Sequence, residues 1–325
     1  MMRICRPGLS FLVTVAALAT VGQAAAQDFP NRIIKLVSPY AVGGSTDLAL
    51  NLFRDRLMQK WGQPVIIEYR PGAAGIVGME QVFRSPPDGY TLLLTPTSPV
   101  TASKHLFTKL RFDPDQFVAV TLISETPNVL VVHPGVPIKT FKELIDYARA
   151  NPQKLNYAST SDGGASHLAT ELMQTMTGTK VNKIPFNGVG PSMAALLGGH
   201  IDMTFTLLSV ALPQIQAGKL RVLAVGSEKR SPFLAADIPA IAETLPGFIS
   251  LNVAGVFAPP GTPPAIVNKL QGALNEILKD PPIAKRYYDI SAVTLGSTPE
   301  ESAAFVRKEG EITGKVIRQI GLKLD

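Results

Sequence analysis

Short apolar runs rich in β-branched residues alternate with stretches of helical periodicity along the whole chain. The apolar runs predict strands at residues 33–37, 65–69, 90–94, 128–132, 155–158, 221–225 and 252–257. Between the first two strands, apolar side chains recur at the spacing of a helix that packs on a sheet: Leu48, Leu52, Phe53, Leu57, Met58 and Trp61. This alternation predicts an α/β fold with mainly parallel sheets flanked by helices.

The N-terminal segment has the pattern of a secretory signal peptide. Arg3 and Arg6 precede an apolar run over residues 9–21, and small residues follow at positions 24–26. The run is shorter than the ~20 residues that a membrane-spanning helix needs, so we expect cleavage after Ala26 rather than anchoring. Because the only cysteine, Cys5, precedes that point, the processed chain lacks thiols, which suits the oxidising periplasm.

The length of the chain predicts two domains, because 325 residues exceed the usual size of one domain. We expect residues 27–127 and 252–325 to form the first domain and residues 128–251 to form the second. No long flexible linker occurs in the sequence. The strands near residues 128–133 and 251–258 are therefore the expected crossings between the domains.

Several classes of function lack their sequence signatures. The net charge of +6 is spread along the chain without a basic block, which argues against nucleic-acid binding. The four histidines lie far apart, and no P-loop or dinucleotide fingerprint occurs, so we expect neither a metal nor a cofactor. We also expect no enzyme, because the G-x-S-x-G turn of α/β hydrolases is absent. A secreted hydrolase that uses Ser166 and His167 is the less favoured alternative.

Three loops that follow predicted strands combine small and hydroxyl residues, and each leads into a helix. The first contains Tyr40, Ala41, Gly43, Gly44, Ser45, Thr46 and Asp47, the second contains Ala73, Ala74 and Gly75, and the third contains Thr97 and Ser98. Glycines let backbone N–H groups face a ligand, and the partial positive charge of a helix N-terminus favours a carboxylate. Since ligands gather beyond the carboxyl ends of strands in open α/β sheets, the three loops predict one shared site.

A fourth loop of the same kind is expected to form the opposite wall of a cleft between the domains. It contains Thr160, Gly164, Ala165, Ser166 and His167. Two alternatives stay open at this point. Ser45 or Thr46 could cap a helix and do nothing more, and His167 could be a structural hydrogen-bonding group rather than a ligand contact or base.

Six segments spread over the chain form one pattern: residues 39–47 (PYAVGGSTD), 70–75 (RPGAAG), 87–93 (PDGYTLL), 155–159 (LNYAS), 196–202 (LLGGHID) and 258–263 (APPGTP). In these segments the chain resembles the Bug family, the substrate-binding proteins of tripartite tricarboxylate transporters. The resemblance implies a two-lobed periplasmic binding protein of type II, hinged like a Venus flytrap around a small organic acid. It also implies that Asp202 lines or supports the second wall. Asn187 departs from the family pattern, since many members carry a basic residue there. Its neutral side-chain amide offers one hydrogen-bond donor group and one acceptor group instead.

The resemblance and the loops together predict a periplasmic solute-binding protein for a small organic carboxylate. The ligand is expected to be a di- or tricarboxylate, an aromatic acid or an acidic amino acid. The expected partners are the membrane subunits of a tripartite tricarboxylate-type transporter, and the protein itself is expected to be a monomer. A ligand-sensing subunit that signals to a sensor kinase of a two-component system is the alternative.

Overall fold

Strands and helices alternate along the chain in a computed structural model that describes residues 29–42, 47–160 and 162–324. The predicted signal peptide and its cleavage point lie outside the described residues. The strands are β1 (Ile34–Ser38), β2 (Val65–Tyr69), β3 (Thr91–Pro96), β4 (Val118–Val132), β5 (Asn156–Ser159), β6 (Asn182–Pro185), β7 (Met203–Leu207), β8 (Arg221–Val225), β9 (Leu251–Ala258) and β10 (Val293–Thr294). The helices are α2 (Asp47–Trp61), α3 (Ile76–Phe83), α4 (Thr97–Leu106), α5 (Phe141–Ala150), α6 (Ala165–Thr177), α7 (Val189–Leu197), α8 (Leu208–Gln216), α9 (Pro264–Leu278), α10 (Pro281–Asp289) and α11 (Pro299–Ile320), with 3-10 turns at Ala73–Gly75, Pro114–Gln116 and Ile241–Glu243.

The strands pair in the order β2-β1-β3-β9-β4-β7-β5-β6, with β8 and β10 also paired to β4. Within each end of this order the pairs are parallel: β1 with β2 and β3, and β5 with β6 and β7. The pairs that involve β4 or β9 are antiparallel. The predicted α/β class is therefore confirmed, and antiparallel strands occur where the chain crosses between its two halves.

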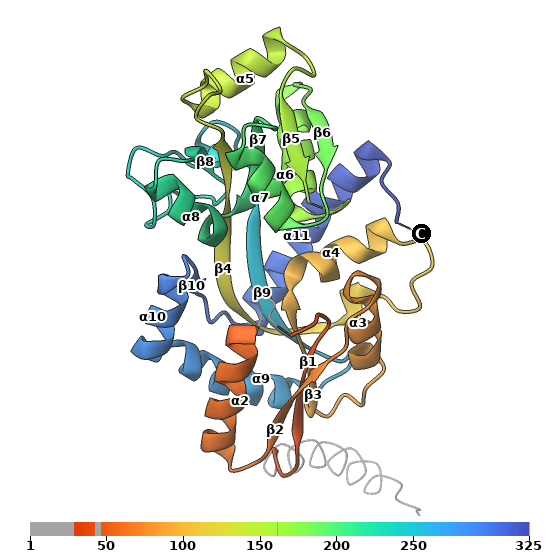
Figure 1. The fold of residues 1–325 in the computed structure, drawn as a ribbon. Coiled ribbons are helices and arrows are strands. Elements are labelled where there is room, and N and C mark those ends of the chain that lie inside the picture. The colour runs from red at the N-terminus through yellow and green to blue at the C-terminus, as the bar shows by residue number, and fades with distance from the viewer. Residues whose placement is uncertain (1–28, 43–46, 161, 325) are drawn as a thin grey trace, which may run out of the picture.

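Strand β4 belongs to both halves of the molecule. Its residues 118–127 pair with β9, whereas residues 128–132 pair with β7 and β8. We call the half with β1, β2, β3, β9 and β10 the first lobe and the half with β5 to β8 the second lobe. Figure 1 shows β4 and β9 rising side by side from the first lobe, below, towards the second, above. The result is the two-lobed fold that the resemblance implied.

Each lobe buries apolar side chains on both faces of its sheet, because helices cover both faces. In the first lobe, α2 contributes Leu50, Phe53 and Leu57, which are at most 1% exposed and pack with residues of α9. Leu48, Leu52 and Trp61 pack against the same core. The prediction that Met58 packs on the sheet is wrong, since 41% of its surface is exposed. The stripe on α2 is narrower than the run of apolar residues suggests.

Several strand segments were not predicted from the sequence. Strand β6 is four residues long and ends in Pro185, so it has the composition of a turn, and β10 is only two residues long. Strand β7 alternates apolar residues with threonine over only five positions. The first ten residues of β4 contain Glu125 and Pro127, and their pairing with β9 shifts register twice, so no clean period of two is visible.

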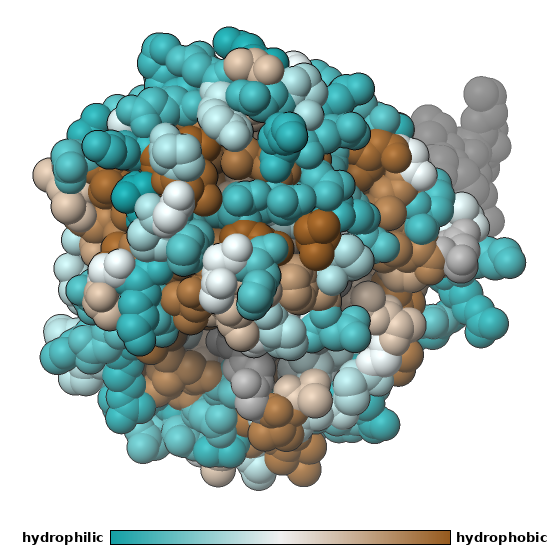
Figure 2. Space-filling view, turned by 45° about the horizontal axis from the view of Figure 1, so that its top comes forward, coloured by the Kyte–Doolittle hydropathy of each residue, from teal (hydrophilic) through white to brown (hydrophobic). Residues whose placement is uncertain are grey.

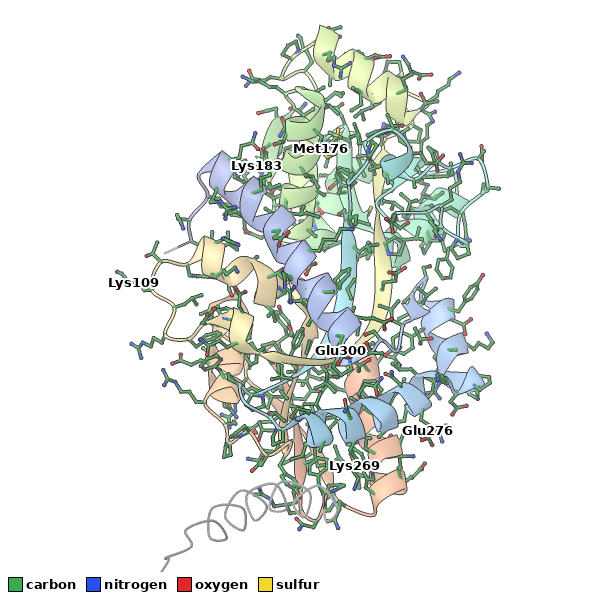
Figure 3. The ribbon with its side chains drawn as sticks, turned by 180° about the vertical axis from the view of Figure 1, so that it is seen from behind. Lys109, Met176, Lys183, Lys269, Glu276 and Glu300 are labelled. Carbon is green, nitrogen blue, oxygen red and sulfur yellow. The ribbon has the colours of Figure 1, made fainter. Side chains whose placement is uncertain are left out.

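Helix α11 provides a third link between the lobes. Seen from behind, it runs diagonally from Glu300, near the sheet of the first lobe, up to the side of α6 in the second (Figure 3). Beyond its end, Leu322 and Leu324 pack with Ala102 and Leu106 of α4 and Leu168 of α6. No helix in residues 29–42, 47–160 or 162–324 is both long and apolar enough to cross a membrane.

The crossing strands are joined by a small hydrogen-bonded node between the lobes. The Asn128 side-chain amide donates to the Ser250 hydroxyl at 3.0 Å, and the Asn128 backbone N–H donates to the Ser250 carbonyl at 3.1 Å. Gly226 donates to the Asn128 carbonyl at 2.7 Å and accepts from the Ser250 N–H at 2.8 Å. A Cβ atom at Gly226 would lie 2.6 Å from the Ser250 carbonyl oxygen, so only glycine fits there.

We predict that Gly226→Ala destabilises the protein by about 1–3 kcal/mol, because the added methyl group overpacks the node. Gly272→Ala is the matched control: Gly272 lies in α9 with no atom within 4 Å of the added Cβ. Alanine favours the helix there, so the control is expected to be neutral or stabilising by up to about 1 kcal/mol. Urea unfolding of both variants measures the difference, and equal stability would contradict the close packing at Gly226.

Candidate functional site

A cavity of about 980 Å³ lies between the two lobes. From the first lobe it is lined by three of the predicted residues, Tyr40, Ala74 and Ser98. From the second lobe it is lined by four more: Thr160, Gly164, Ala165 and Ser166. Asn128 and Ser250, the residues of the node, also lie in its wall. In the space-filling view, hydrophilic residues cover most of the face, and apolar residues form scattered patches between them (Figure 2).

Two helices from opposite lobes begin at this cavity. Ser98 lies in the first turn of α4, and Ala165 is the first residue of α6; both are exposed and line the cavity. Among the described residues, no side chain caps the N-terminus of either helix. The first N–H groups of a helix have no partner inside it and carry partial positive charge. The two helix starts are therefore suited to an anionic group.

Hydroxyl groups complete the polar part of the wall. The Ser166 hydroxyl accepts a hydrogen bond from the Thr160 N–H at 3.0 Å and lies 3.1 Å from the Thr160 hydroxyl. Ser103, on the second turn of α4, is 2% exposed. Within the described ranges its hydroxyl makes no hydrogen bond. The Ser103 hydroxyl oxygen is itself buried, so it lies behind the cavity wall and is not presented to the cavity.

The loop after β2 approaches the cavity in a strained conformation. Ala73 and Ala74 have φ angles of 45° and 53°, in the left-handed region that alanine rarely adopts. Gly75 has φ 96°, and a Cβ there would lie 3.6 Å from the Tyr40 hydroxyl. This left-handed backbone places the loop beside Tyr40, which lines the cavity.

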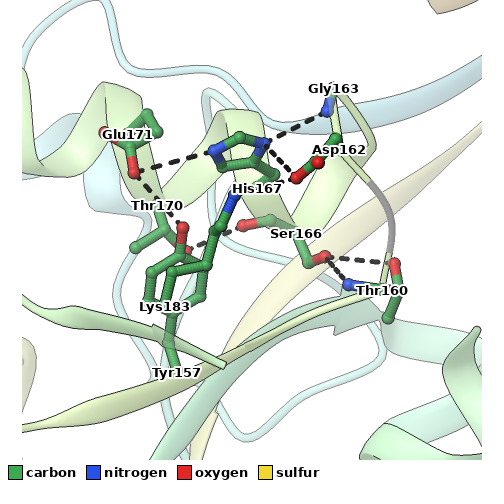
Figure 4. A network of polar contacts seen from close by, with 9 residues as sticks. All are labelled: Tyr157, Thr160, Asp162, Gly163, Ser166, His167, Thr170, Glu171 and Lys183. Carbon is green, nitrogen blue, oxygen red and sulfur yellow. Dashed lines mark hydrogen bonds and ion pairs between the residues drawn. The ribbon is translucent and has the colours of Figure 1, made fainter. Parts of the chain in front are cut away.

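His167 does not line the cavity but holds the loop in front of α6. It is 4% exposed, and its Nδ1 accepts a hydrogen bond from the Gly163 N–H at 3.1 Å (Figure 4). Its Nε2 lies 3.8 Å from Glu171, which accepts a hydrogen bond from the Tyr157 hydroxyl. Burial, and then the charge of Lys183, lower the pKa of His167. His167 is therefore a neutral imidazole that accepts a hydrogen bond from the loop. This is the structural role that the sequence analysis gave as one of its two alternatives.

Asp202 and Asn187 also lie outside the cavity wall. The Asp202 carboxylate accepts from the backbone N–H and the side-chain amide of Asn156, at 2.7 Å and 3.1 Å, so it fixes the start of β5. Asn187 is exposed on the loop between β6 and α7, next to Val189, which does line the cavity. Neither residue touches the volume between the lobes in this conformation.

The remaining predicted residues are placed as follows. Thr97 is fully buried at the start of α4, and Ala41, Asp47, Ala73 and Gly75 do not line the cavity. Gly43, Gly44, Ser45 and Thr46 lie outside the described residues. No group of three or more metal-ligating side chains occurs among the residues that the structure describes.

Several parts of the wall were missed by the sequence analysis, among them residues 205–207 and 249–252 and two longer stretches. One is the loop from Ser227 to Phe233 after β8, and the other is the face of α11 from Phe305 to Val316. The helical period of α11 is visible in the sequence, but the period alone does not tell a cavity wall from a core. The loop carries no glycine-rich signal, so only the fold brings it to the site.

Glu309 of α11 is an acidic group in the cavity wall. It is half-buried, and its carboxylate lies 3.2 Å from the Thr101 hydroxyl of α4, which donates to it. Burial raises the pKa of Glu309 to about 7, although the hydroxyls of Thr97 and Thr101 partly offset the effect. At neutral pH this carboxyl is therefore divided between its neutral and ionised forms.

We predict that Glu309→Gln changes how the stability of the protein depends on pH. Between the ordinary pKa of 4.5 and the folded value of about 7, the folded protein holds the Glu309 proton more tightly than the unfolded chain does. Stability from this group is therefore fully present below about pH 4.5 and is lost as the pH rises through about 7.

The melting temperature of the Glu309→Gln variant, measured relative to the native protein, should thus rise between about pH 5 and about pH 8. We expect a gain of about 2 °C, allowing for the partial exposure of the carboxyl. Glu311→Gln, at an exposed position of the same helix, is the control and should show a flat difference. A flat difference for Glu309→Gln as well would contradict the raised pKa.

Comparison with known proteins gives the same picture as the geometry. A family model described as the tripartite tricarboxylate transporter family receptor matches residues 51–322. BugT of Bordetella pertussis is 33% identical over 313 residues, which cover 94% of this chain and 96% of that protein. Among solved structures, Rpa4515 of R. palustris with adipate has a TM-score of 0.74 and 32% identity, covering 91% of this chain and 100% of that one. MatC from Rhodopseudomonas palustris with bound malate has a TM-score of 0.71 and 31% identity, covering 89% of this chain and 100% of that one.

Two lobes that share a pair of crossing strands, with a cavity between them, define a periplasmic-type solute-binding protein. The chain belongs to the tripartite tricarboxylate transporter receptor family, TctC, and its resemblance to the Bug proteins is confirmed. This family consists of periplasmic binding proteins that work with transporter membrane subunits. It is not a family of enzymes, so the hydrolase alternative is set aside.

Proposed function

We propose that this protein captures a small organic carboxylate between its lobes and delivers it to a tripartite tricarboxylate-type transporter. The observation that carries the proposal is the meeting of two uncapped helix N-termini, those of α4 and α6, at one cavity. They come from opposite lobes, so a single carboxylate can be held by both. The adipate and malate in the two related structures support this class of ligand.

The carboxylate is held mainly by neutral donors. Backbone N–H groups at the starts of α4 and α6 and the hydroxyls of Ser98, Thr160 and Ser166 replace the water around the anion. Arg230, a cation in the wall, is engaged by Glu243, with an N–O distance of 2.7 Å. Neutral donors bind a carboxylate without the large desolvation cost of burying a second charge.

Binding closes the lobes about the crossing strands. Residues 27–127 with 252–325 act as one rigid unit and residues 128–251 as the other, with the node of Asn128, Ser250 and Gly226 at their junction. A ligand that touches both lobes binds the closed form more tightly and so increases its population. The membrane subunits of the transporter then recognise the closed monomer, and the released signal peptide accounts for its location in the periplasm.

We predict that the purified protein is stabilised by organic acids and not by neutral sugars. A ligand at 100 times its dissociation constant adds about 2.7 kcal/mol to the free energy of unfolding. Thermal shift assays with mono-, di- and tricarboxylates, aromatic acids and acidic amino acids measure this effect. Stabilisation by sugars alone would refute the carboxylate proposal.

The same assay tests the site when it is repeated on Ala165→Leu, which places a bulky side chain at the exposed start of α6. We expect this variant to lose at least tenfold in affinity for whichever acid binds. Ala194→Leu, at an exposed position of α7 away from the cavity wall, should bind normally. Equal affinity of the two variants would place the carboxylate elsewhere.

Processing of the exported chain is a separate prediction. Since small residues at positions 24–26 precede the expected cleavage point, the periplasmic form should begin at Gln27. Intact-mass measurement of protein released from the periplasm of an expressing cell checks this. A mass that retains residues 1–26 would show that the segment is not removed.

A further inference from the structure

The cavity continues from its polar end into an apolar trough between three helices. Helix α4 contributes Ala102 and Leu106, α6 contributes Leu168 and Leu172, and α11 contributes Phe305 and Ile312. On each helix these residues recur at four- or seven-residue spacing, so each helix presents one face to the trough. Two of the helices belong to the first lobe and one to the second, so the trough is a junction between the lobes.

The trough is continuous with the polar end along two of the three helices. Ser98 of α4 and Ser166 of α6 lie in the first turns, whereas Leu106 and Leu172 lie two turns further along the same helices. A molecule whose carboxylate binds at the two helix starts would therefore extend its body between α4 and α6, towards α11. Polar recognition at one end and apolar contact along the body are the usual composition of a small-molecule site.

The protein closes only one part of the trough, where Leu322 and Leu324 pack with Ala102 and Leu106. Leu168, Leu172, Phe305 and Ile312 are each only partly buried, although they line an interior cavity. Covering such surface gains about 25 cal/mol per Å² of apolar area removed from water. The cavity of about 980 Å³ is also at the upper end of the range of about 300–1,000 Å³ for drug-sized ligands. An acid of a few carbon atoms would leave the trough unfilled.

The charges at the trough do not favour a second carboxylate. Glu309 lies on the same face of α11, between Phe305 and Ile312. Lys308 beside it is exposed, so its ammonium group is solvated. A second ionised carboxylate at this end would leave water and face another carboxyl group, which is unfavourable.

We propose that the trough between α4, α6 and α11 holds the apolar body of the ligand. The preferred ligand then carries one carboxylate on a body at least as large as an aromatic ring, and not two or three carboxylates on a short chain. This inference rests on the proposed function, because it takes the carboxylate at the starts of α4 and α6 as given. It distinguishes the ligand of this protein from the adipate and malate of its two relatives.

Isothermal titration of the purified protein with propionate, benzoate, 3-phenylpropionate, succinate and citrate tests the ligand class. We expect 3-phenylpropionate to bind at least tenfold more tightly than succinate or citrate, and propionate to bind weakly. Tighter binding of succinate or citrate would overturn the trough proposal and leave the carboxylate function intact. If no acid of any length binds, the proposed function fails together with the inference.

A variant that fills the trough tests the location. Thr313→Phe adds a ring to the trough face of α11, whereas Ala304→Phe adds the same ring at an exposed position of that helix. Thr313→Phe should weaken the binding of 3-phenylpropionate at least tenfold and leave the affinity for propionate within twofold of the native value. Ala304→Phe should change neither affinity.

Equal weakening of both acids by Thr313→Phe, or of neither, would overturn the assignment of the trough. Circular dichroism and the melting temperature verify that both variants fold. Should Thr313→Phe fail to fold, Phe305→Ala replaces it, with a selective loss of 3-phenylpropionate affinity again expected. The titrations of the native protein test the ligand class without any variant.

Discussion

The structure depends on one strand that is shared by two sheets. Because β4 pairs with β9 over its first ten residues and with β7 and β8 over its last five, one strand extends the sheet of the first lobe and joins β8 to β7 in the second. The lobes are therefore connected along a shared strand, and the cavity lies where the pairing partner of that strand changes. Asn128, Ser250 and Gly226 satisfy the backbone groups at that change with hydrogen bonds of 2.7–3.1 Å.

The position of the cavity follows from this arrangement. In each lobe, strands lead into helices, and α4 and α6 are two of the helices that begin at the cavity; α3 at Ile76 and α7 at Val189 also begin there. The donors that the proposed function assigns to the anion are thus mainly backbone groups placed by the fold. Under that proposal the wall accepts carboxylates of many shapes, and the volume behind the anion decides the selectivity.

That volume is shaped by the last helix of the chain. Helix α11 packs closely on α4, where a Cβ at Gly314 would lie 2.3 Å from His105, and it reaches α6 in the second lobe. Its inner face gives the trough both apolar side chains and the carboxyl of Glu309. Under the trough proposal, a helix that touches both lobes and lines the cavity would couple the size of the bound molecule to the distance between the lobes.

The sequence by itself determined the class of fold and the family, since strand and helix periods and the six motif segments are local features of the chain. It also indicated seven of the residues that line the cavity, because loops after parallel strands collect at one edge of a sheet. The sequence did not distinguish these lining residues from Asp202 and His167, which do not line the cavity. Those two side chains bind Asn156 and Gly163, and only the folded structure brings these partners to them. Only the tertiary structure placed the loop after β8 and the face of α11 in the cavity wall, because periodicity shows which side of a helix is apolar and not what that side faces.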